Sequence, residues 1–383
     1  MSATGGPERL LMVGGGPPHL FVLEGLSRGR IPPTDVTLVS MHPRQALGGM
    51  IPGFVEGRYR LEEITIDLAA IVRRLGGTFV EGVASRLDPT SRIVTLDDGR
   101  TIPYDVASLA VGGIPAGAGL PGVRQFARIP RPVVQLRELS AALDHAAGNP
   151  GPEPLNVVVV GAGARGCELA LAVRARLDRL GASRVIITLI DSSHAPLRDR
   201  SPIAQEEAER VLRAGEITLR VSTRAEAVGP DHVRLTGGRV LPADIVIWAT
   251  GIEAPSLFRE SGLPSDARGY LSVENTLEVP GYASLFGAGD AVSLLDAPPI
   301  PKAGSHSFRQ GPILADNLRA AFLGSARRRR RYALKPNTLA LISAGDERAI
   351  FSYGGITVTA GWAMRLKERI DRRFVRRFQR LQS

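Results

Sequence analysis

The chain of 383 residues is too long for one small domain and suits two or three linked domains. Its 44% hydrophobic and 22% charged residues predict a packed globular protein, and the single cysteine, Cys167, excludes an intramolecular disulfide and a cysteine-rich metal site, so no metal is expected. The net charge of +10 belongs to residues 324–383, which carry 15 basic and 4 acidic side chains against 33 and 34 in residues 1–323, so the body is close to neutral.

The first part of the chain alternates short apolar runs with helical patterns. Residues 9–13 form an apolar run that ends in three glycines, which predicts a buried parallel strand entering a turn. Helices are expected over residues 18–28 and 62–75. Strands are expected at residues 36–40, 78–83, 93–96 and 108–111.

A second cycle of the same kind begins at residue 156. Four valines lead into the turn GAGARG, and a helix over residues 167–180 and a strand over residues 185–191 follow. A helix over residues 203–214 and strands at 233–235 and 245–248 complete the cycle. The repetition predicts an α/β fold with two interleaved Rossmann-like dinucleotide-binding domains.

The first turn, GGGPPH, matches the pattern GxGxxG in two of its three glycines. Gly14 permits a tight turn, and Gly16 lets the backbone approach a pyrophosphate at the N-terminus of the following helix. His19 stands at the third glycine position, and Ser40 ends the next strand where an acid would contact a ribose. The turn can still hold a dinucleotide, although the pattern alone also matches other turns.

The second turn has all three glycines, Gly161, Gly163 and Gly166, between a strand and a helix. Asp191 closes the next strand, where a carboxylate would accept hydrogen bonds from the adenosine ribose and repel a 2′-phosphate. This favours NADH over NADPH, and Arg198 nearby would weaken the preference. The alternative is that Asp191 is an ordinary turn residue.

Three further segments have the form of an apolar strand that ends in small residues. They are SLFGAGDAV (residues 284–292), which contains Gly289 and Asp290, VIWATG (residues 246–251), which ends at Gly251, and SLAVGG (residues 108–113), which contains Gly112.

ATG followed by GAGD, together with two dinucleotide turns, resembles the two-dinucleotide-binding flavoproteins of the pyridine nucleotide–disulfide oxidoreductase superfamily over residues 9–323. The resemblance implies FAD at the first turn and NADH or NADPH as co-substrate at the second. It also implies that Asp290 holds the flavin ribityl chain and that Glu168 lies close to the nicotinamide.

A redox-active cysteine pair is missing, as in type II NADH dehydrogenases, which the chain also resembles. It is more similar still to the flavoprotein module fused to the N-terminus of some selenide, water dikinases, although the kinase domain is absent. The stretches that carry this likeness are GGMIPGFVEGRY (residues 48–59), ITIDL (64–68), DDGRTIPYDVASLAVG (97–112) and KAGSHSFRQGPILADNL (302–318).

By this resemblance, Met50, Ile51 and Pro52 lie near the flavin ring. Arg309 and Gln310 begin a helix whose N-terminal dipole would stabilise negative charge on the reduced ring. Arg309 stands where quinone-reducing relatives often carry a neutral amide. His306 is a candidate proton donor to the acceptor, although a lone loop histidine is more often merely polar.

The expected architecture is a discontinuous FAD-binding domain (residues 1–125 and 252–323), an NAD(P)H-binding domain (126–251) and a basic C-terminal segment (324–383). The five arginines at residues 327–331 read as a solvated loop. No apolar run reaches about 18 residues and no signal peptide is recognisable, so we expect a cytoplasmic protein, either free or peripheral on the inner face of the cell membrane.

Residues 362–381 are expected to form a basic amphipathic helix. Trp362, Leu366, Ile370, Phe374 and Phe378 recur at every fourth position and predict one apolar stripe. Such a helix suits an anionic membrane surface, or else packs on the body or in a homodimer. Nucleic acid is not expected, because no base-stacking platform accompanies the arginines.

The leading hypothesis is an FAD-dependent NADH dehydrogenase that passes electrons to an acceptor, with a quinone as the first choice. One alternative is a reductase of a protein or a selenium-containing acceptor. The other is a non-catalytic flavoprotein or nucleotide sensor.

Overall fold

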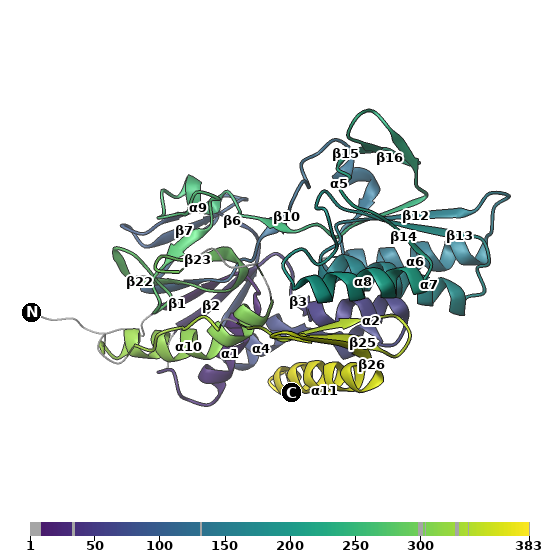
Figure 1. Ribbon diagram of the computed structural model, residues 1–383. Helices are drawn as coiled ribbons and strands as arrows, with labels where there is room; N and C mark the ends of the chain where they lie inside the picture. Colours follow the sequence, from purple (N-terminus) through teal and green to yellow (C-terminus); the bar gives the residue numbers. More distant parts are fainter. Residues whose placement is uncertain are drawn as a thin grey trace, which may run out of the picture.

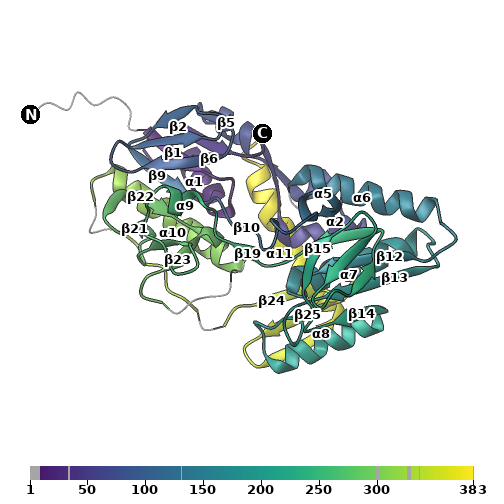
Figure 2. The same ribbon diagram turned by 90° about the horizontal axis from the view of Figure 1, so that it is seen from above.

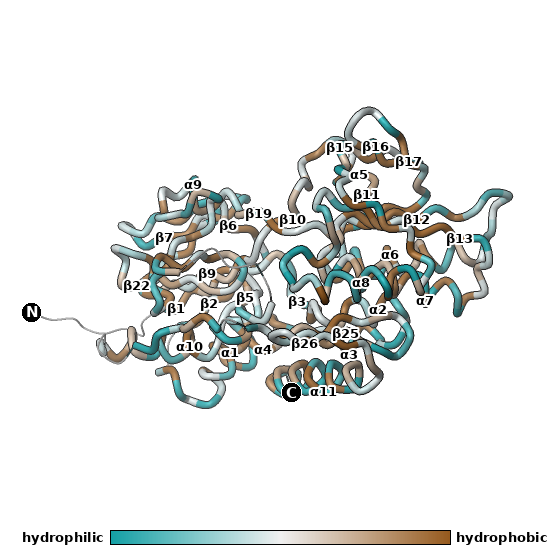
Figure 3. Tube along the Cα trace, viewed as in Figure 1, coloured by the Kyte–Doolittle hydropathy of each residue, from teal (hydrophilic) through white to brown (hydrophobic). Residues whose placement is uncertain are grey.

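The computed structural model describes residues 9–32, 35–130, 132–297, 302, 304–325, 329–335 and 337–382. Two α/β lobes lie side by side, and the C-terminal segment lies beneath their junction in Figure 1. Figure 3 shows hydrophobic residues gathered in the strands of both lobes, as expected for sheets that are covered on both faces.

The first lobe is built on a sheet with the order β21-β22-β9-β1-β2-β5. All neighbours are parallel except β21, which is antiparallel to β22. Helices α1 (Pro17–Ser27) and α10 (Gly304–Phe322) pack against each other on this sheet. The strands are β1 (Arg9–Val13), β2 (Asp35–Ser40), β5 (Thr78–Glu81), β9 (Val106–Leu109), β21 (Glu278–Val279) and β22 (Tyr282–Gly287).

The second lobe repeats the arrangement with the fully parallel order β11-β18-β12-β13-β14. Its helices are α6 (Val133–Gly148), α7 (Ala164–Arg179) and α8 (Pro202–Ala214). Its strands are β11 (Ala127–Arg128), β12 (Leu155–Val160), β13 (Val185–Ile190), β14 (Ile217–Arg220) and β18 (Ile245–Trp248). Two sheets of this order confirm the predicted pair of Rossmann-like units.

Small antiparallel sheets complete both lobes. β6 (Ala84–Asp88), β7 (Ile93–Leu96) and β8 (Thr101–Pro103) extend the first lobe, and β15 (Ala225–Val228), β16 (His232–Leu235) and β17 (Val240–Pro242) extend the second. The chain passes between the lobes through β10 (Ile114–Pro115) and β19 (Ile252–Glu253), which pair with each other. The domain limits at residues 125, 251 and 323 stay a prediction.

The helix expected over residues 62–75 is wrong as a single element. The structure has α3 (Leu61–Ile64), then β4 (Thr65–Asp67), then α4 (Leu68–Arg74). Residues 65 and 66 are β-branched and pair with β3 (Arg44–Ala46), and the Asp67 carboxylate accepts a hydrogen bond from the Ala70 amide at 2.8 Å to cap α4. Strand pairing and capping therefore outweigh the helical spacing.

The C-terminal segment forms a third layer. β24 (Ala340–Ser343), β25 (Ala349–Tyr353) and β26 (Ile356–Ala360) make an antiparallel sheet, and α11 (Gly361–Gln379) follows directly. The sheet contacts α7 and α8 of the second lobe, whereas α11 runs from this sheet toward the first lobe (Figure 2). The segment therefore contacts both lobes.

The face that α11 turns to the body differs from the predicted stripe. Phe378 is buried, and it packs with Phe374 against Phe21 of α1, but Trp362 and Ile370 are each 45% exposed. A row at every fourth residue drifts by roughly 40° per step around a helix of about 3.6 residues per turn, so its two ends face different surroundings. The body-facing side chains at the start of α11 are those of Ala363, Met364 and Lys367.

Of the arginines after α10 that the structure describes, Arg330 and Arg331 are exposed, as expected for a solvated loop, whereas Arg329 is not. Arg327 and Arg328 lie outside the described residues, but the Arg329 side chain is only 10% exposed, pairs with Glu278 and lies over the Phe286 ring. Within the part of the chain that the structure describes, no helix is long and apolar enough to cross a lipid bilayer.

Candidate functional site

The first glycine turn lies where the parallel strands β1, β2, β9 and β22 all end. Gly14 has φ +96°, and a Cβ placed on it would lie 2.5 Å from the carbonyl oxygen of Ala110 at the end of β9. A Cβ on Gly16 would meet the same oxygen at 2.5 Å. The chain therefore needs glycine here to bring the start of α1 against the sheet, as a dinucleotide cradle does.

His19 takes the place of the third glycine by hydrogen bonding. Its imidazole is fully buried, with Nδ1 2.6 Å from the Gly14 carbonyl oxygen and Nε2 2.9 Å from Ser108 Oγ. Burial lowers the pKa of His19 to about 4, so the ring is neutral at pH 7. The sequence analysis did not single out Ser108, although a polar residue within a predicted buried strand indicates that its side chain needs a partner.

The GAGD segment lies beside this turn. Gly289 has φ +84°, and a Cβ on it would lie 3.4 Å from Pro18 Cγ in the first turn of α1. The Gly289 amide donates to Gln310 Oε1 at 2.6 Å, and Ser307 Oγ donates to Asp290 Oδ1 at 3.3 Å. Helix α10 thus holds Gly289 and Asp290 against the N-terminus of α1.

Ser40 and Gly112 lie at the same edge of the sheet. Ser40 is the last residue of β2, and its Oγ would lie 3.0 Å from a Cβ on Gly15. Gly112 has φ +72° and no atom within 4 Å of a Cβ placed on it, so it borders open space.

Helix α10 begins at Gly304, five residues before the predicted start. Pro312 therefore lies inside the helix. Gln310 is buried, whereas Arg309 Nη2 donates to the Ala333 carbonyl at 2.8 Å and its guanidinium lies over the Tyr332 ring. Neither residue lies at the helix N-terminus.

His306 is a helix residue rather than the predicted loop residue. Its Nδ1 lies 2.8 Å from the hydroxyl of Tyr332, and burial lowers its pKa. Tyr332 was not foreseen, because only the fold brings it next to α10.

Lys302 is a further unforeseen group near Asp290. Its Nζ lies 3.9 Å above the Tyr270 ring and bonds to the carbonyl of Val292. Burial lowers the pKa of Lys302 to about 8, although Asp266 and Asp290 act in the opposite direction.

The second glycine turn has the same construction. Gly161 has φ +106°, and a Cβ on Gly166 would lie 1.6 Å from the Gly161 carbonyl oxygen, which no side chain could tolerate. Nothing lies within 4 Å of a Cβ placed on Gly163 or on Gly251. Gly163 and Gly251 border open space, and Gly161 and Gly166 are closely packed. Together they form a cradle at the carboxyl ends of β12 and β18.

Asp191 follows β13 and faces this turn. Its Oδ2 accepts from the Ala162 amide at 2.6 Å and its Oδ1 from the Ser193 amide at 2.7 Å. The carboxylate is therefore held at the glycine turn.

Glu168 on α7 lies at the junction of the three layers. It is buried, and its Oε1 accepts from the Ser343 amide at 2.9 Å and lies 3.5 Å from Lys367 Nζ of α11. Lys367 Nζ also donates to the Gly49 carbonyl at 2.7 Å and to Asp371 at 3.2 Å. Burial raises the pKa of Glu168, although Lys367 acts to lower it.

Met50, Ile51 and Pro52 adjoin this junction. Met50 ends a short 3-10 helix (Gly48–Met50), and α2 (Ile51–Glu56) follows and packs against α7. All three residues are buried, so the predicted flavin-side loop is a packed corner connected to Glu168 through Gly49 and Lys367.

The residues present fit two dinucleotides. Each lobe has a glycine turn at the carboxyl ends of its strands, next to the point where the strand order reverses, and the positive dipole end of a helix at that turn. Helix α1 begins with Pro17 and Pro18, which have no amide hydrogen, so the first turn offers a pyrophosphate mainly this dipole and its glycine backbone. The first turn is accompanied by Asp290 and the second by Asp191.

The chain is similar to known proteins over most of its length. Residues 7–312 match the family model described as pyridine nucleotide-disulphide oxidoreductase. A demethylphylloquinone reductase, NdbB, of Synechocystis sp. is 26% identical over 377 residues, which cover 94% of this chain and 90% of that protein. The NADH dehydrogenase-like protein Rv1812c of Mycobacterium tuberculosis is 30% identical over 238 residues, or 61% of this chain and 60% of that protein.

Solved structures have the same fold. The sulfide:quinone oxidoreductase of Aquifex aeolicus superposes with a TM-score of 0.80 at 20% identity and covers 98% of this chain and 92% of its own. NDH2 of Plasmodium falciparum, solved with NADH, has a TM-score of 0.78 at 13% identity and covers 98% and 99%. The chain belongs to the pyridine nucleotide-disulphide oxidoreductase family and is an FAD-dependent NAD(P)H oxidoreductase.

Proposed function

We propose that the protein transfers a hydride from NADH to FAD and passes the electrons to a quinone. The observation that carries this is the pair of glycine cradles on two lobes that Lys367 joins through Gly49 and Glu168. The flavin, when bound, accepts the hydride and releases electrons to the acceptor, and the protein positions the two rings and excludes water. The nearly full-length likeness to a demethylphylloquinone reductase supports a quinone as acceptor.

The chain's own residues would bind and orient the cofactors. Gly14 and Gly16 admit the FAD pyrophosphate, Asp290 binds the ribityl chain, and Gln310 holds the Gly289 turn in place. Ser40 and Gly112, at the same edge of the sheet, would also contact this cofactor, and Met50, Ile51 and Pro52 would support its site as a packed corner.

At the second cradle, Gly161 and Gly163 admit the NADH pyrophosphate, and Gly166 lets α7 approach the sheet. Asp191 would bind the ribose, which favours NADH over NADPH. Glu168 would lie beside the nicotinamide, where its raised pKa lets it carry a proton at pH values at which an exposed glutamate would not.

The acceptor side would involve α10. His306, whose Nδ1 lies against the Tyr332 hydroxyl, is the candidate proton donor to a reduced acceptor. Because burial lowers its pKa, it would donate only after taking up a proton itself. The Arg309 guanidinium donates to the Ala333 carbonyl and lies over the ring of Tyr332, the residue that holds His306.

A quinone dissolves in the bilayer, so we propose that the protein works as a peripheral protein at a membrane. The exposed apolar residues Ile356, Val358 and Trp362 lie together around β26 and the start of α11 and would meet the lipid. A homodimer through the same surface is the competing arrangement, and light scattering of the purified protein distinguishes the two.

The test is an acceptor screen on FAD-loaded protein. NADH should bleach the flavin absorbance without oxygen, and a menaquinone or ubiquinone analogue should restore it faster than a protein disulfide or selenite. Bleaching without quinone-driven recovery would refute the quinone assignment, and absence of bleaching would refute the dehydrogenase.

Asp191→Ala tests the NADH site within the same assay. Losing hydrogen bonds to a charged group should raise the KM for NADH roughly tenfold and change kcat little. The control is Glu206→Ala, which removes an exposed carboxylate on α8, outside the turn. An unaltered KM in Asp191→Ala would refute the ribose role.

A further inference from the structure

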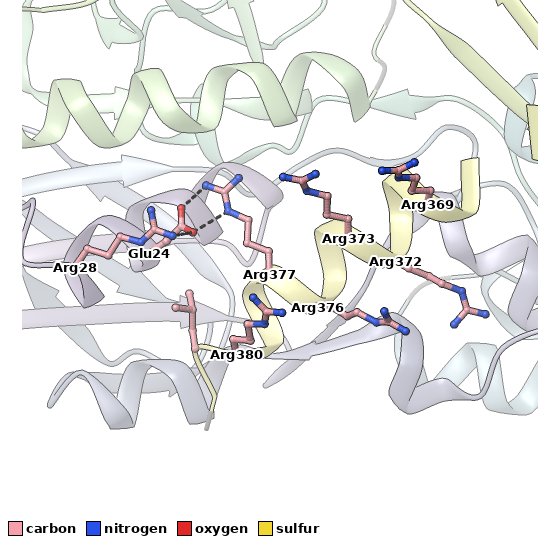
Figure 4. A pocket seen from close by; sticks show the side chains of 9 residues that line it. Glu24, Arg28, Arg369, Arg372, Arg373, Arg376, Arg377 and Arg380 are labelled. Atoms are coloured by element: carbon pink, nitrogen blue, oxygen red, sulfur yellow. Dashed lines mark hydrogen bonds and ion pairs between the residues drawn. The ribbon is translucent and has the colours of Figure 1, made fainter. Parts of the chain in front are cut away.

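The outer face of α11 carries two rows of arginines. Each row has three arginines spaced by four residues. The second row starts three residues after the first, so the two rows lie about 60° apart around the helix axis. Figure 4 shows these side chains projecting from α11. The rows are Arg369, Arg373 and Arg377, and Arg372, Arg376 and Arg380.

The acidic residues of the same helix do not neutralise these rows. Glu368 accepts hydrogen bonds from Arg58 and Tyr59, and Asp371 pairs with the buried Lys367, so both face the body. Among the residues that the structure describes, the side chains of four of these arginines have no hydrogen-bond or ion-pair partner. Like charges spaced by three or four residues destabilise a helix. These four, Arg369, Arg373, Arg376 and Arg380, are all exposed.

The rows border a hollow of about 830 Å³ between α11 and the C-terminal end of α1. One wall comes from α1, where the buried Glu24 carboxylate accepts from Arg377 Nε at 2.8 Å and from Arg28 Nη2 at 2.8 Å. Burial raises the pKa of Glu24, but the hydrogen bond from Arg377 and the neighbouring charges lower it overall, so the carboxylate stays ionised. Glu24 thus fixes two guanidinium groups at the hollow.

The lining consists of seven arginines, Glu24 and Leu381, so its net charge is +6. A guanidinium group presents paired donors that match phosphate oxygens. The hollow is concave, has walls from two elements and has the size of a small-molecule site, whereas a bilayer would meet a flat or convex face. From Arg369 to Arg380 the helix rises about 16 Å, enough for several phosphates.

We propose that this hollow, the arginine site, binds a soluble ligand that carries several phosphate groups. It lies at the opposite end of α1 from the first glycine turn and is separate from the proposed redox reaction. Binding would neutralise the arginine rows and tie α11 to α1.

The test is calorimetric titration of the FAD-loaded protein with sodium tripolyphosphate, with and without saturating NADH. One site per chain is expected, insensitive to NADH and weakened by salt. Substituting Arg369, Arg373, Arg376 and Arg380 by Ala should weaken binding more than tenfold. The matched control substitutes Arg73, Arg74, Arg213 and Arg239, whose side chains are also exposed and have no partner in the described part of the chain. It should bind as the wild type does.

The other outcomes overturn the proposal. Equal losses in both variants would mean general charge attraction, and loss of binding with NADH would place the phosphate at the glycine turn. Binding to phosphatidylglycerol vesicles without binding to tripolyphosphate would make the rows a membrane contact. The NADH–acceptor rate of the Ala variant should be unchanged, so failure of this site is distinct from failure of the proposed redox function.

Discussion

At the scale of single residues, the two glycine turns differ most at their third position. Gly166 is required because a Cβ would collide with the Gly161 carbonyl, whereas His19 fills the equivalent position and bonds to the Gly14 carbonyl and Ser108. The sequence pattern marks His19 as a departure, but it does not reveal that the imidazole ties the turn to β9. His19 is therefore a structural part of the first cradle.

This geometry makes the protein sensitive to acid through His19. Its pKa in the fold is about 4, below the ordinary 6.5, so the unfolded chain binds the proton first as the pH falls. The contribution of neutral His19 to the free energy of unfolding is complete above pH 6.5. It is lost as the pH falls toward 4, by up to about 3 kcal/mol.

His19→Gln should therefore lose stability at pH 7 but show a smaller further loss at pH 5 than the wild type. Urea unfolding of both proteins at the two pH values measures this. If the wild type and His19→Gln lost the same stability between pH 7 and pH 5, His19 would not be the titrating group.

At the scale of elements, α11 is held to the body by aromatic residues near its C-terminus. Phe378 is fully buried, with its ring 5.2 Å from Phe21 and 4.8 Å from Phe374. Phe378→Ala should destabilise this docking by about 3–5 kcal/mol, because it leaves a cavity in the cluster.

Ile370→Ala, on the same helix and 45% exposed, is the matched control and should change stability by less than about 1 kcal/mol. Thermal unfolding and limited proteolysis of α11 provide the readouts. Similar effects from both substitutions would mean that the helix does not dock as described.

At the scale of the whole molecule, Lys367 links the C-terminal helix to both lobes. Lys367→Met would leave Glu168 and Asp371 without their ammonium partner, and breaking a buried pair in this way costs about 3–5 kcal/mol. Unfolding should begin at a lower temperature in both lobes.

Adding Glu168→Gln to Lys367→Met should recover part of the loss, because it removes one of the stranded charges. Hydrogen exchange across α2 and α7 reports whether the junction loosens. Independent, additive effects of the two substitutions would contradict the coupling.

The sequence by itself determined the two dinucleotide-binding units, because each strand, glycine turn and helix is encoded within a short contiguous stretch. It also marked Asp191 and the GAGD segment, whose positions follow from strand ends. The interrupted helix at residues 62–75 was not predictable, since the pairing of β3 with β4 decided it.

Only the tertiary structure decided which residues meet between segments distant in the chain. Lys367 reaches Gly49 across 318 residues, Glu168 reaches Ser343 across 175, and Arg377 reaches Glu24 across 353. The face of α11 that is buried depends on these contacts rather than on its own periodicity. Packing between lobes selects the partners, and a local pattern carries no information about them.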